Sequence, residues 1–387
     1  AALKRGEKPA TQANTSGVGG CLARDQGREQ VLGERPYIDD MTRPEMLHGA
    51  VVWTPHPKCK IINVDTSKAL ALEGVTSVLV AEDFDGDRKV GLIYRDWPVM
   101  IGTGEVTNCS ADIIAVVAAE TRDIALQARD LVELTCEELD PITDLIAASK
   151  DPANLLKSCN VVKGDVDKAL KGCAHVISET FQTQVIDQAF LEPEATLVVP
   201  TINGGVHIYS CGQGVFDDER QLVSVLGLPE DKIVVELVPT GGAFGAKEDL
   251  NLQPHAAKLA LITGRPVKIA LTMEESLRYH PKRHATHIEF TLGATETGDF
   301  VAVKTRILGD TGGYASVGDK VLERAAGHAC GPYSVPNVSV EALTIKTNNP
   351  VCGAMRGFGV NQIAFAMEGC IDRLCEKLEM DKWQLRW

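Results

Sequence analysis

Residues 231–260 read DKIVVELVPT GGAFGAKEDL NLQPHAAKLA and contain both kinds of element from which the chain is built. The run IVVELV predicts a strand, and the segment HAAKLA predicts a helix. Between them, Gly241, Gly242 and Gly245 permit positive φ angles and close backbone approach, so N–H groups at a helix start can face an anion or an oxo group. Lys247 lacks the following Ser or Thr of a P-loop, and the glycine spacing is not a dinucleotide fingerprint. The cluster indicates either a ligand-facing turn or a structural tight turn.

Strands and helices continue on both sides of this stretch. From Val161 onward the runs TLVVP, VHIYS, RPVKIAL, HIEFTL, FVAVKTRIL and VEALTIK predict strands. A helix is expected after Asp217, ending at Gly227, and a last amphipathic helix over 361–378. Residues 37–140 mix short strands and helices. The sequence therefore predicts an α+β protein.

The domain limits follow from changes in this pattern. Residues 1–30 are rich in Gly, Lys, Thr and Ala without periodicity and predict a poorly ordered tail or connector. Residues 31–145 form the first α+β unit. Prolines and polar residues interrupt the strand pattern over 141–160, and we interpret 146–160 as a linker. Residues 161–387 form the second unit.

The acidic net charge of the chain limits the kinds of molecule that it is expected to bind. The chain has 53 acidic and 39 basic side chains, a formal net charge of −14, which argues against nucleic acid and anionic membranes. No run approaches the roughly eighteen consecutive apolar residues of a membrane helix. The opening AALKRGEKPATQANTS lacks the apolar segment of a signal peptide. We expect a soluble, cytoplasmic protein.

Cysteine and histidine patterns give little sign of a metal site. None of the eleven cysteines forms a Cys-x-x-Cys pair, so we expect mostly small buried hydrophobic side chains, with a functional thiol as the alternative. The segment HPKRHATH holds His280, His284 and His287, which could suggest a metal triad. Pro281 disfavours a continuous helix there, and HIEFTL predicts a strand, so we expect no direct protein ligand to a metal.

A second glycine cluster, CGAMRGFG over 352–359, lies between a predicted strand and the last helix. Arg356 is flanked by glycine-rich backbone, and a guanidinium needs hydrogen-bond acceptors. The cluster predicts either contact with a polar ligand or a surface turn.

The order of six segments across 35–387 resembles the molybdenum-binding chain of the xanthine dehydrogenase and aldehyde oxidase family. The segments are YIDDM with MLHGAVVWTPHPKCKI, DIIAVVAAET, QAFLEPEATLVVP, GGAFGAKE, LERAAGHACGPYSVPN and GAMRGFGVNQ. The phrase GQGVFDD and the Glu after GGAFGAK look most like the members that hydroxylate purines or other N-heterocycles, including selenium-dependent ones. The resemblance implies a hammerhead-like α/β domain followed by the first molybdenum-binding domain.

The resemblance also implies a cofactor and partners. The cofactor is molybdopterin with molybdenum, in the cytosine dinucleotide form. The reaction converts RH and water to ROH with release of two electrons, which leave through [2Fe-2S] clusters and FAD on partner chains or domains. The expected partners are an iron–sulfur subunit, an FAD subunit, a second molybdenum-binding chain or segment, and a small heterocyclic substrate.

The resemblance implies that five residues of this chain contact the cofactor, because they match motifs of the family. Gln213 is similar to the glutamine that donates a hydrogen bond to the oxo ligand of molybdenum. Phe244 and Gly245, with Gly242, resemble the turn whose backbone lies against the cofactor. Arg356 resembles a residue close to the metal.

Three residues are carried over toward the substrate. Glu248 matches the glutamate that hydrogen-bonds purine-type substrates, a position that is apolar in the aldehyde oxidases. Arg324 is similar to the arginine that stabilises negative charge developing on the heterocycle, and a fixed guanidinium suits that role because it favours the transition state. Phe358 resembles a residue that stacks on the substrate ring.

Departures from the family pattern affect the shape of the expected pocket. Ala243 and Ala246 replace glycines, Met355 replaces a phenylalanine, and 360–361 reads Val-Asn in place of Gly-Pro. The family's general-base glutamate belongs to a later segment, beyond Trp387. Two alternatives remain: an aldehyde oxidoreductase of the same family, and a non-catalytic scaffold subunit.

Overall fold

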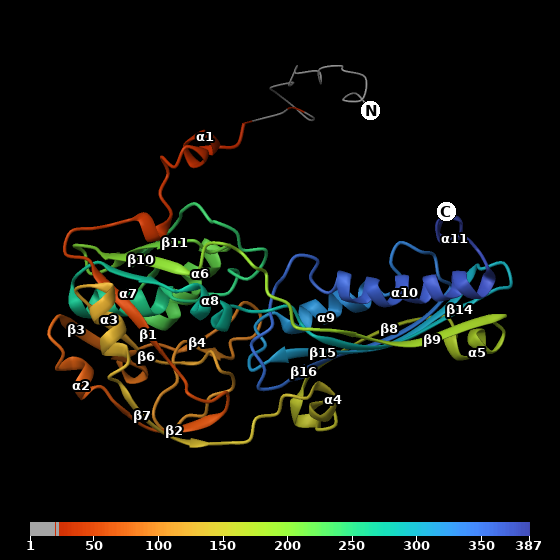
Figure 1. Cartoon of the computed structure of the whole chain (residues 1–387), viewed down its shortest axis with the longest axis horizontal. Coiled ribbons are helices and arrows are strands. Elements are labelled where there is room, and N and C mark those ends of the chain that lie inside the picture. Colours follow the sequence, from red (N-terminus) through yellow and green to blue (C-terminus); the bar gives the residue numbers. More distant parts are fainter. Residues whose placement is uncertain (1–19, 21–22) are drawn as a thin grey trace.

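The computed structural model describes residue 20 and residues 23–387, which form two lobes (Figure 1). One lobe contains a seven-stranded sheet and the other a five-stranded sheet. Residues 1–19, 21 and 22 of the predicted tail lie outside the described residues, whereas its last part enters the short helix α1 (Gly27–Val31).

The first lobe joins strands from distant parts of the chain. Across the sheet the order is β12 (Ile233–Leu237), β11 (Val206–Ser210), β10 (Ala195–Pro200), β13 (Val267–Ala270), β1 (Leu47–Trp53), β6 (Ile113–Ala119) and β3 (Val75–Val80). β1 and β13 pair in parallel, with Leu47 opposite Val267. The strands on both sides of that pair share one hydrophobic core. The two sequence segments therefore fold into a common sheet, and their domain limits stay a prediction.

Helices and short ribbons surround this sheet. The helices are α2 (Ser67–Leu70), α3 (Arg122–Arg129), α6 (Val215–Leu226), α7 (Gln253–Thr263) and α8 (Met273–Tyr279), and the ribbons pair β2 (Cys59–Asp65) with β7 (Glu133–Glu138) and β4 (Lys89–Val90) with β5 (Trp97–Pro98). α6 ends where Gly227 takes a φ of 65°, as the sequence predicted. α7 has a proline in its first turn and ends at Gly264, with a φ of 67°.

The second lobe is a five-stranded sheet with helices on its faces. Its strands, in order, are β8 (Leu155–Lys163), β16 (Asn337–Lys346), β15 (Phe300–Gly312), β14 (Thr286–Ala294) and β9 (His175–Thr183). The helices are α4 (Leu145–Ala148), α5 (Val166–Lys171), α9 (Gly318–Gly327), α10 (Val360–Leu378) and α11 (Lys382–Arg386). α9 and α10 lie along one side of the sheet (Figure 1). Their apolar residues form the second core with β14, β15 and β16.

The last helix and the segment at Pro281 agree with the sequence prediction, whereas the start of β8 does not. The predicted last helix is α10, whose buried face includes Ile363, Met367 and Ile371. Pro281 does follow the end of a helix, because α8 stops at Tyr279 and β14 begins at Thr286. The expectation that strands resume at Val161 was wrong: β8 begins six residues earlier, at Leu155, where it pairs with β16. Pro152 lies in a short turn before β8, and polar residues did not exclude a strand because β8 is an edge strand with mostly exposed side chains.

Candidate functional site

The two predicted glycine clusters meet in the structure as the first turn, residues 240–248, and the second turn, residues 352–359. Gly245 has a φ of 108°, and a Cβ atom added there would lie 2.6 Å from a backbone carbonyl oxygen of the second turn. The Arg356 N–H donates to the Phe244 carbonyl oxygen at 2.9 Å. A side chain at 245 would separate the turns, so glycine is required by close approach as well as by φ.

Gln213 lies just beyond the end of β11 and is tied to the first turn by two hydrogen bonds. The Gly245 N–H donates to Gln213 Oε1 at 3.0 Å. The Gln213 N–H donates to the Lys247 carbonyl oxygen at 2.8 Å. Because Oε1 accepts from the turn, the amide nitrogen is the donor end of this exposed side chain. The structure thus brings Gln213 and the first turn together.

Both turns contain a phenylalanine in a strained backbone conformation. Phe244 has a φ of 54° and Phe358 a φ of 47°, in the left-handed region that side chains rarely adopt. Phe244 is 48% exposed, whereas Phe358 packs against the core of the second lobe. Such strain persists only where the surrounding structure holds it, and it is concentrated at functional sites.

The second turn also rests on α9, the helix that carries Arg324. A Cβ atom added to Gly359 would lie 2.1 Å from the Val321 carbonyl oxygen and 3.1 Å from the Ala325 nitrogen. Arg324 precedes Ala325 in the last turn of α9 and is exposed. Arg356 is exposed as well. Two guanidinium side chains therefore extend from neighbouring elements, on the same part of the molecule as the turns.

Carboxyl groups gather beneath the first turn. Glu248 is half-buried, and burial, with a smaller effect of Asp249, raises its pKa. Asp249 accepts a hydrogen bond from Ser316, and burial raises its pKa to about 6. Burial likewise raises the pKa of Asp218 to about 7, although the Ser210 hydroxyl donates to it at 3.3 Å. These groups retain a proton more readily than exposed carboxyls do.

Sequence reasoning missed two residues that hold the second turn. The Gln188 amide nitrogen donates to the Ala354 carbonyl oxygen at 3.0 Å. The Arg283 guanidinium donates to the Arg356 carbonyl oxygen at 2.7 Å and to Asn361 Oδ1 at 2.9 Å. The two residues belong to the segments QAFLEPEATLVVP and HPKRHATH, respectively. The only sign of these roles in the sequence is that Gln188 and Arg283 are polar residues next to predicted strands.

The histidines of HPKRHATH do not converge. His280 lies between two carboxylates, with Nε2 2.8 Å from Asp187 and Nδ1 3.3 Å from Glu194. His284 is fully buried, and burial lowers its pKa to about 3. His287 lies on β14 beside Gln182, at 3.3 Å.

The described residues show no disulfide, no cluster of metal-binding side chains and no membrane-spanning helix. The ten cysteines there are free thiols. The same residues contain no group of three or more His, Cys, Asp or Glu side chains that could hold a metal ion. None of the described helices is long and apolar enough to cross a bilayer.

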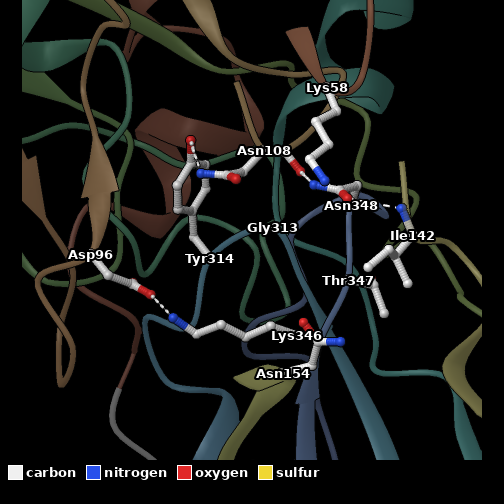
Figure 2. Close-up of a pocket in the computed structure, with 10 residues that line it drawn as sticks. All are labelled: Lys58, Asp96, Asn108, Ile142, Asn154, Gly313, Tyr314, Lys346, Thr347 and Asn348. Carbon is white, nitrogen blue, oxygen red and sulfur yellow. Dashed lines mark hydrogen bonds and ion pairs between the residues drawn. The ribbon is translucent and has the colours of Figure 1, made fainter. Parts of the chain in front are cut away.

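A cavity of about 260 Å³ lies elsewhere, where the two lobes join (Figure 2). It is lined by Lys58, Asp96, Asn108, Ile142, Asn154, Gly313, Tyr314, Lys346, Thr347 and Asn348. Lys346 pairs with Asp96 at 3.2 Å, and Asn348 donates to the Asn108 carbonyl oxygen at 3.0 Å. The lining contains none of the predicted site residues. The candidate site is thus the surface of the two turns, separate from this cavity.

The surface of the turns fits a cofactor that brings its own metal ligands. It offers half-buried backbone at Gly242, which has a positive φ, an amide donor on Gln213, and the guanidinium of Arg356, whereas the backbone of Gly245 is buried and holds the Gln213 amide. Glycines let a flat group approach the backbone closely, and amide and guanidinium donors suit oxo and phosphate oxygens.

Comparison with known families identifies the class of protein to which this fold and surface belong. The molybdopterin cofactor-binding domain matches residues 148–387, and the a/b hammerhead domain of aldehyde oxidase and xanthine dehydrogenase matches residues 32–140. The chain therefore belongs to the molybdenum hydroxylase family that includes these enzymes. The predicted family and the predicted order of hammerhead and molybdopterin-binding domains are confirmed.

Individual relatives include a probable xanthine dehydrogenase subunit of Bacillus subtilis, which is 38% identical over 94% of this chain and 49% of the relative. The nicotinate dehydrogenase large molybdopterin subunit of Eubacterium barkeri is 36% identical over 92% of this chain and 85% of that subunit. The chain thus spans about half of the first relative but most of the second.

Among solved structures, the aldehyde oxidoreductase of Desulfovibrio gigas superposes with a TM-score of 0.90 and 26% identity, over 100% of this chain and 45% of that chain. Quinoline 2-oxidoreductase of Pseudomonas putida 86 gives a TM-score of 0.86 and 25% identity, over 94% of this chain and 49% of that one. Proteins named for an aldehyde and for an N-heterocycle thus share this fold.

Proposed function

We propose that this chain is the molybdopterin-binding part of a hydroxylase that oxidises a purine or another N-heterocycle with water as the oxygen source. The meeting of the two turns is the observation that carries the proposal. It brings the exposed residues Gln213, Phe244 and Arg356 together around the buried Gly245. The hydrogen bonds from Gly245 to Gln213 and from Arg356 to Phe244 hold this arrangement.

On the cofactor side, this chain's residues bind and orient. The Gln213 amide nitrogen donates to an oxo group, and the backbone at Gly242, Phe244 and Gly245 lies against the cofactor. Arg356 adds a positive charge to the same surface. When bound, the cofactor supplies the two-electron redox chemistry, and the protein supplies position and electrostatics.

On the substrate side, Glu248, Arg324 and Phe358 act on the heterocycle. Burial raises the pKa of Glu248, so its carboxyl group shares a proton with a ring nitrogen or exocyclic oxygen more readily than an exposed carboxylate. Arg324 stabilises the negative charge that develops on the ring. Phe358 offers a ring face. In balance, RH and water give ROH, two protons and two electrons.

The two electrons require acceptors outside this chain. We propose an iron–sulfur subunit carrying [2Fe-2S] clusters, an FAD subunit, and a second molybdenum-binding chain or segment that supplies the general base. The Eubacterium barkeri relative, which is described as a large molybdopterin subunit, supports a division into several chains. We further propose the cytosine dinucleotide form of the cofactor, a selenium-dependent or sulfur-dependent metal centre, and a cytoplasmic location.

The test is to purify everything that associates with this chain and to measure molybdenum, the pterin nucleotide, iron, flavin and selenium. Turnover is then followed with xanthine, nicotinate and an aromatic aldehyde, using an artificial electron acceptor. Molybdenum in the complex with turnover of a heterocycle is expected. A complex without molybdenum would favour the scaffold alternative and reject the proposal.

An aldehyde oxidoreductase is the second candidate, favoured by the superposition on the Desulfovibrio gigas enzyme. The residue that distinguishes the two candidates is Glu248, because the resemblance implies an apolar side chain at this position in aldehyde oxidases. Preference for the aldehyde in the same assay would select this second candidate.

A further inference from the structure

Lys247, in the first turn, is buried in a way that the proposed cofactor contacts do not explain. Its side chain is fully buried, although lysine almost always keeps its ammonium group in water. Its Nζ donates to the Glu192 carbonyl oxygen at 2.7 Å and lies 3.1 Å from Glu192 Oε2. The same nitrogen is 4.8 Å from the ring centroid of Phe190. The ammonium group is therefore directed into the protein, away from the surface that faces a ligand.

The Glu192 carboxylate connects the two ends of the first turn. The Gly241 N–H donates to Glu192 Oε2 at 2.6 Å, and this is the oxygen that accepts from Lys247. The Glu192 side chain is only 14% exposed, and its other oxygen has no hydrogen-bond partner among the described residues. One carboxylate oxygen thus joins Gly241, at the start of the turn, to Lys247, near its end.

The conformation of the turn is passed on to Gln213. The backbone of Lys247 accepts from the Gln213 N–H, and the Gly245 N–H orients the Gln213 amide. Phe244 sits at the apex with a φ of 54°, which the chain adopts only if its ends are held. A shift of the Lys247 backbone would therefore move both contacts of Gln213.

We propose that Glu192 and Lys247 are a positioning pair, which fixes the first turn and the Gln213 amide in the geometry that receives the molybdopterin cofactor. The inference rests on the proposed function. Neither side chain touches the cofactor. Removing one partner leaves an uncompensated buried charge, whereas removing both charges does not. The single variants should therefore be worse than the double variant.

The experiment compares Lys247→Met, Glu192→Gln and the double variant in the assembled enzyme. The measurements are molybdenum per chain, the loss of cofactor on dilution, and the electron paramagnetic resonance signal of the partly reduced metal. Contacts that orient a metal site indirectly typically contribute about 10- to 100-fold in affinity, and each single variant should lose cofactor by such a factor. The double variant should recover part of the loss, because the amide oxygen introduced by Glu192→Gln still accepts from Gly241 without leaving a buried charge.

Lys268→Met is the matched control. Lys268 is 6% exposed, and its Nζ donates to the carbonyl oxygens of Asp39 at 2.6 Å and Met41 at 3.1 Å. It is another buried lysine of the first lobe, bonded to a different segment. The control should lower thermal stability while it leaves molybdenum content and the resonance signal unchanged.

Three results would overturn the inference. The single variants could match the parent in molybdenum content and resonance signal, the Lys268→Met control could lose as much cofactor as Lys247→Met, or the double variant could be worse than both single variants. If Lys247→Met fails to assemble, Glu192→Gln and the double variant carry the comparison. A parent complex without molybdenum is a separate result, which rejects the proposed function and this inference with it.

Discussion

The two glycine-rich turns reach one surface but are held by different chemistry. The first turn is tied at both ends by a carboxylate and a buried ammonium group, those of Glu192 and Lys247. The second turn is held through its backbone carbonyl groups, which accept from the neutral amide of Gln188 and from the Arg283 guanidinium. Replacing either Glu192 or Lys247 leaves the other charge buried without its partner. In the second turn, the hydrogen bonds from Gln188 and Arg283 go to different carbonyl groups, so one can be removed without removing the other.

The difference corresponds to what each turn presents. The first turn positions backbone and an amide, which act only at hydrogen-bond distance, so its geometry must be fixed closely. The second turn and α9 present Arg356 and Arg324, whose charges act over longer distances and tolerate small displacements. The Glu192–Lys247 ion pair therefore supports the turn that makes short-range contacts. Independent hydrogen bonds support the turn whose charges act over longer distances.

The largest expected effect is loss of all turnover when this chain is purified without partners. Both turns present exposed side chains, such as Phe244 at 48%, and the proposed general base lies outside the chain. We expect weak cofactor binding and no hydroxylation with an artificial electron acceptor. The assembled complex, assayed in parallel, is the control. Turnover by the isolated chain would show that the two turns alone complete a site.

Next in size is Arg324→Met in the assembled enzyme, which removes the charge on the side of the second turn and keeps much of the stem. Loss of one contact to developing charge should lower kcat by about 100-fold, with little change in molybdenum content. Arg306→Met, on β15, is the control, since that arginine pairs with Glu341 at 2.8 Å, away from the turns. If kcat is unchanged when chemistry limits the rate, Arg324 has no such role.

Glu248→Val tests the first turn in the same way. A substrate donor left without its partner costs roughly 1 to 3 kcal/mol, which is about a 5- to 150-fold fall in kcat/KM for purine or pyridine substrates. Aromatic aldehydes lack that donor and should be unaffected or improved. Glu236→Val, at a carboxylate that pairs with His207 on the sheet edge, is the control. Equal losses on both substrate classes would instead assign Glu248 to the support of the turn.

The sequence was sufficient to predict the turns because their signals are local. Gly242 and Gly245 have positive φ, Gly241 allows a close approach of Glu192, and the ordered motifs indicated the family. The amphipathic pattern of α10 also lies within one segment, so its bounds agreed within one residue.

The residues that hold the turns could not be predicted, because their partners are distant in sequence. Lys247 and Glu192 are 55 residues apart, and Gln188 and Ala354 are 166 apart. The residues around Lys247 argue against a P-loop but do not show where its ammonium group points, and only the fold shows that it is directed inward. For the same reason the chain's division into segments did not predict that β1 and β13 share a sheet.

The smallest predicted effect concerns Asp218, which lies next to the helix start that follows Gln213. Burial raises its pKa from 3.8 to about 7, so around neutral pH the folded chain binds a proton that the unfolded chain has released. The free energy of unfolding must then fall as pH rises through the folded pKa. For one such group the fall is about 1.4 kcal/mol between pH 6 and pH 8.

Asp218→Asn should remove that fall, because an amide carries no titrating proton. The measurement is the free energy of urea unfolding of the purified chain at pH 6 and pH 8, for parent and variant. Asp249 and Asp112, whose pKa values burial raises to about 6, and His255 and His284, whose pKa values burial lowers to about 4 and about 3, contribute to the pH dependence of both proteins alike, so the test is the difference between parent and variant. Asp217→Asn is the control, since the Asp217 carboxylate is 47% exposed and pairs with Arg220. If Asp218→Asn keeps the full pH dependence of the parent, Asp218 is ionised in the folded protein, and the carboxyl groups beneath the first turn do not store a proton at neutral pH.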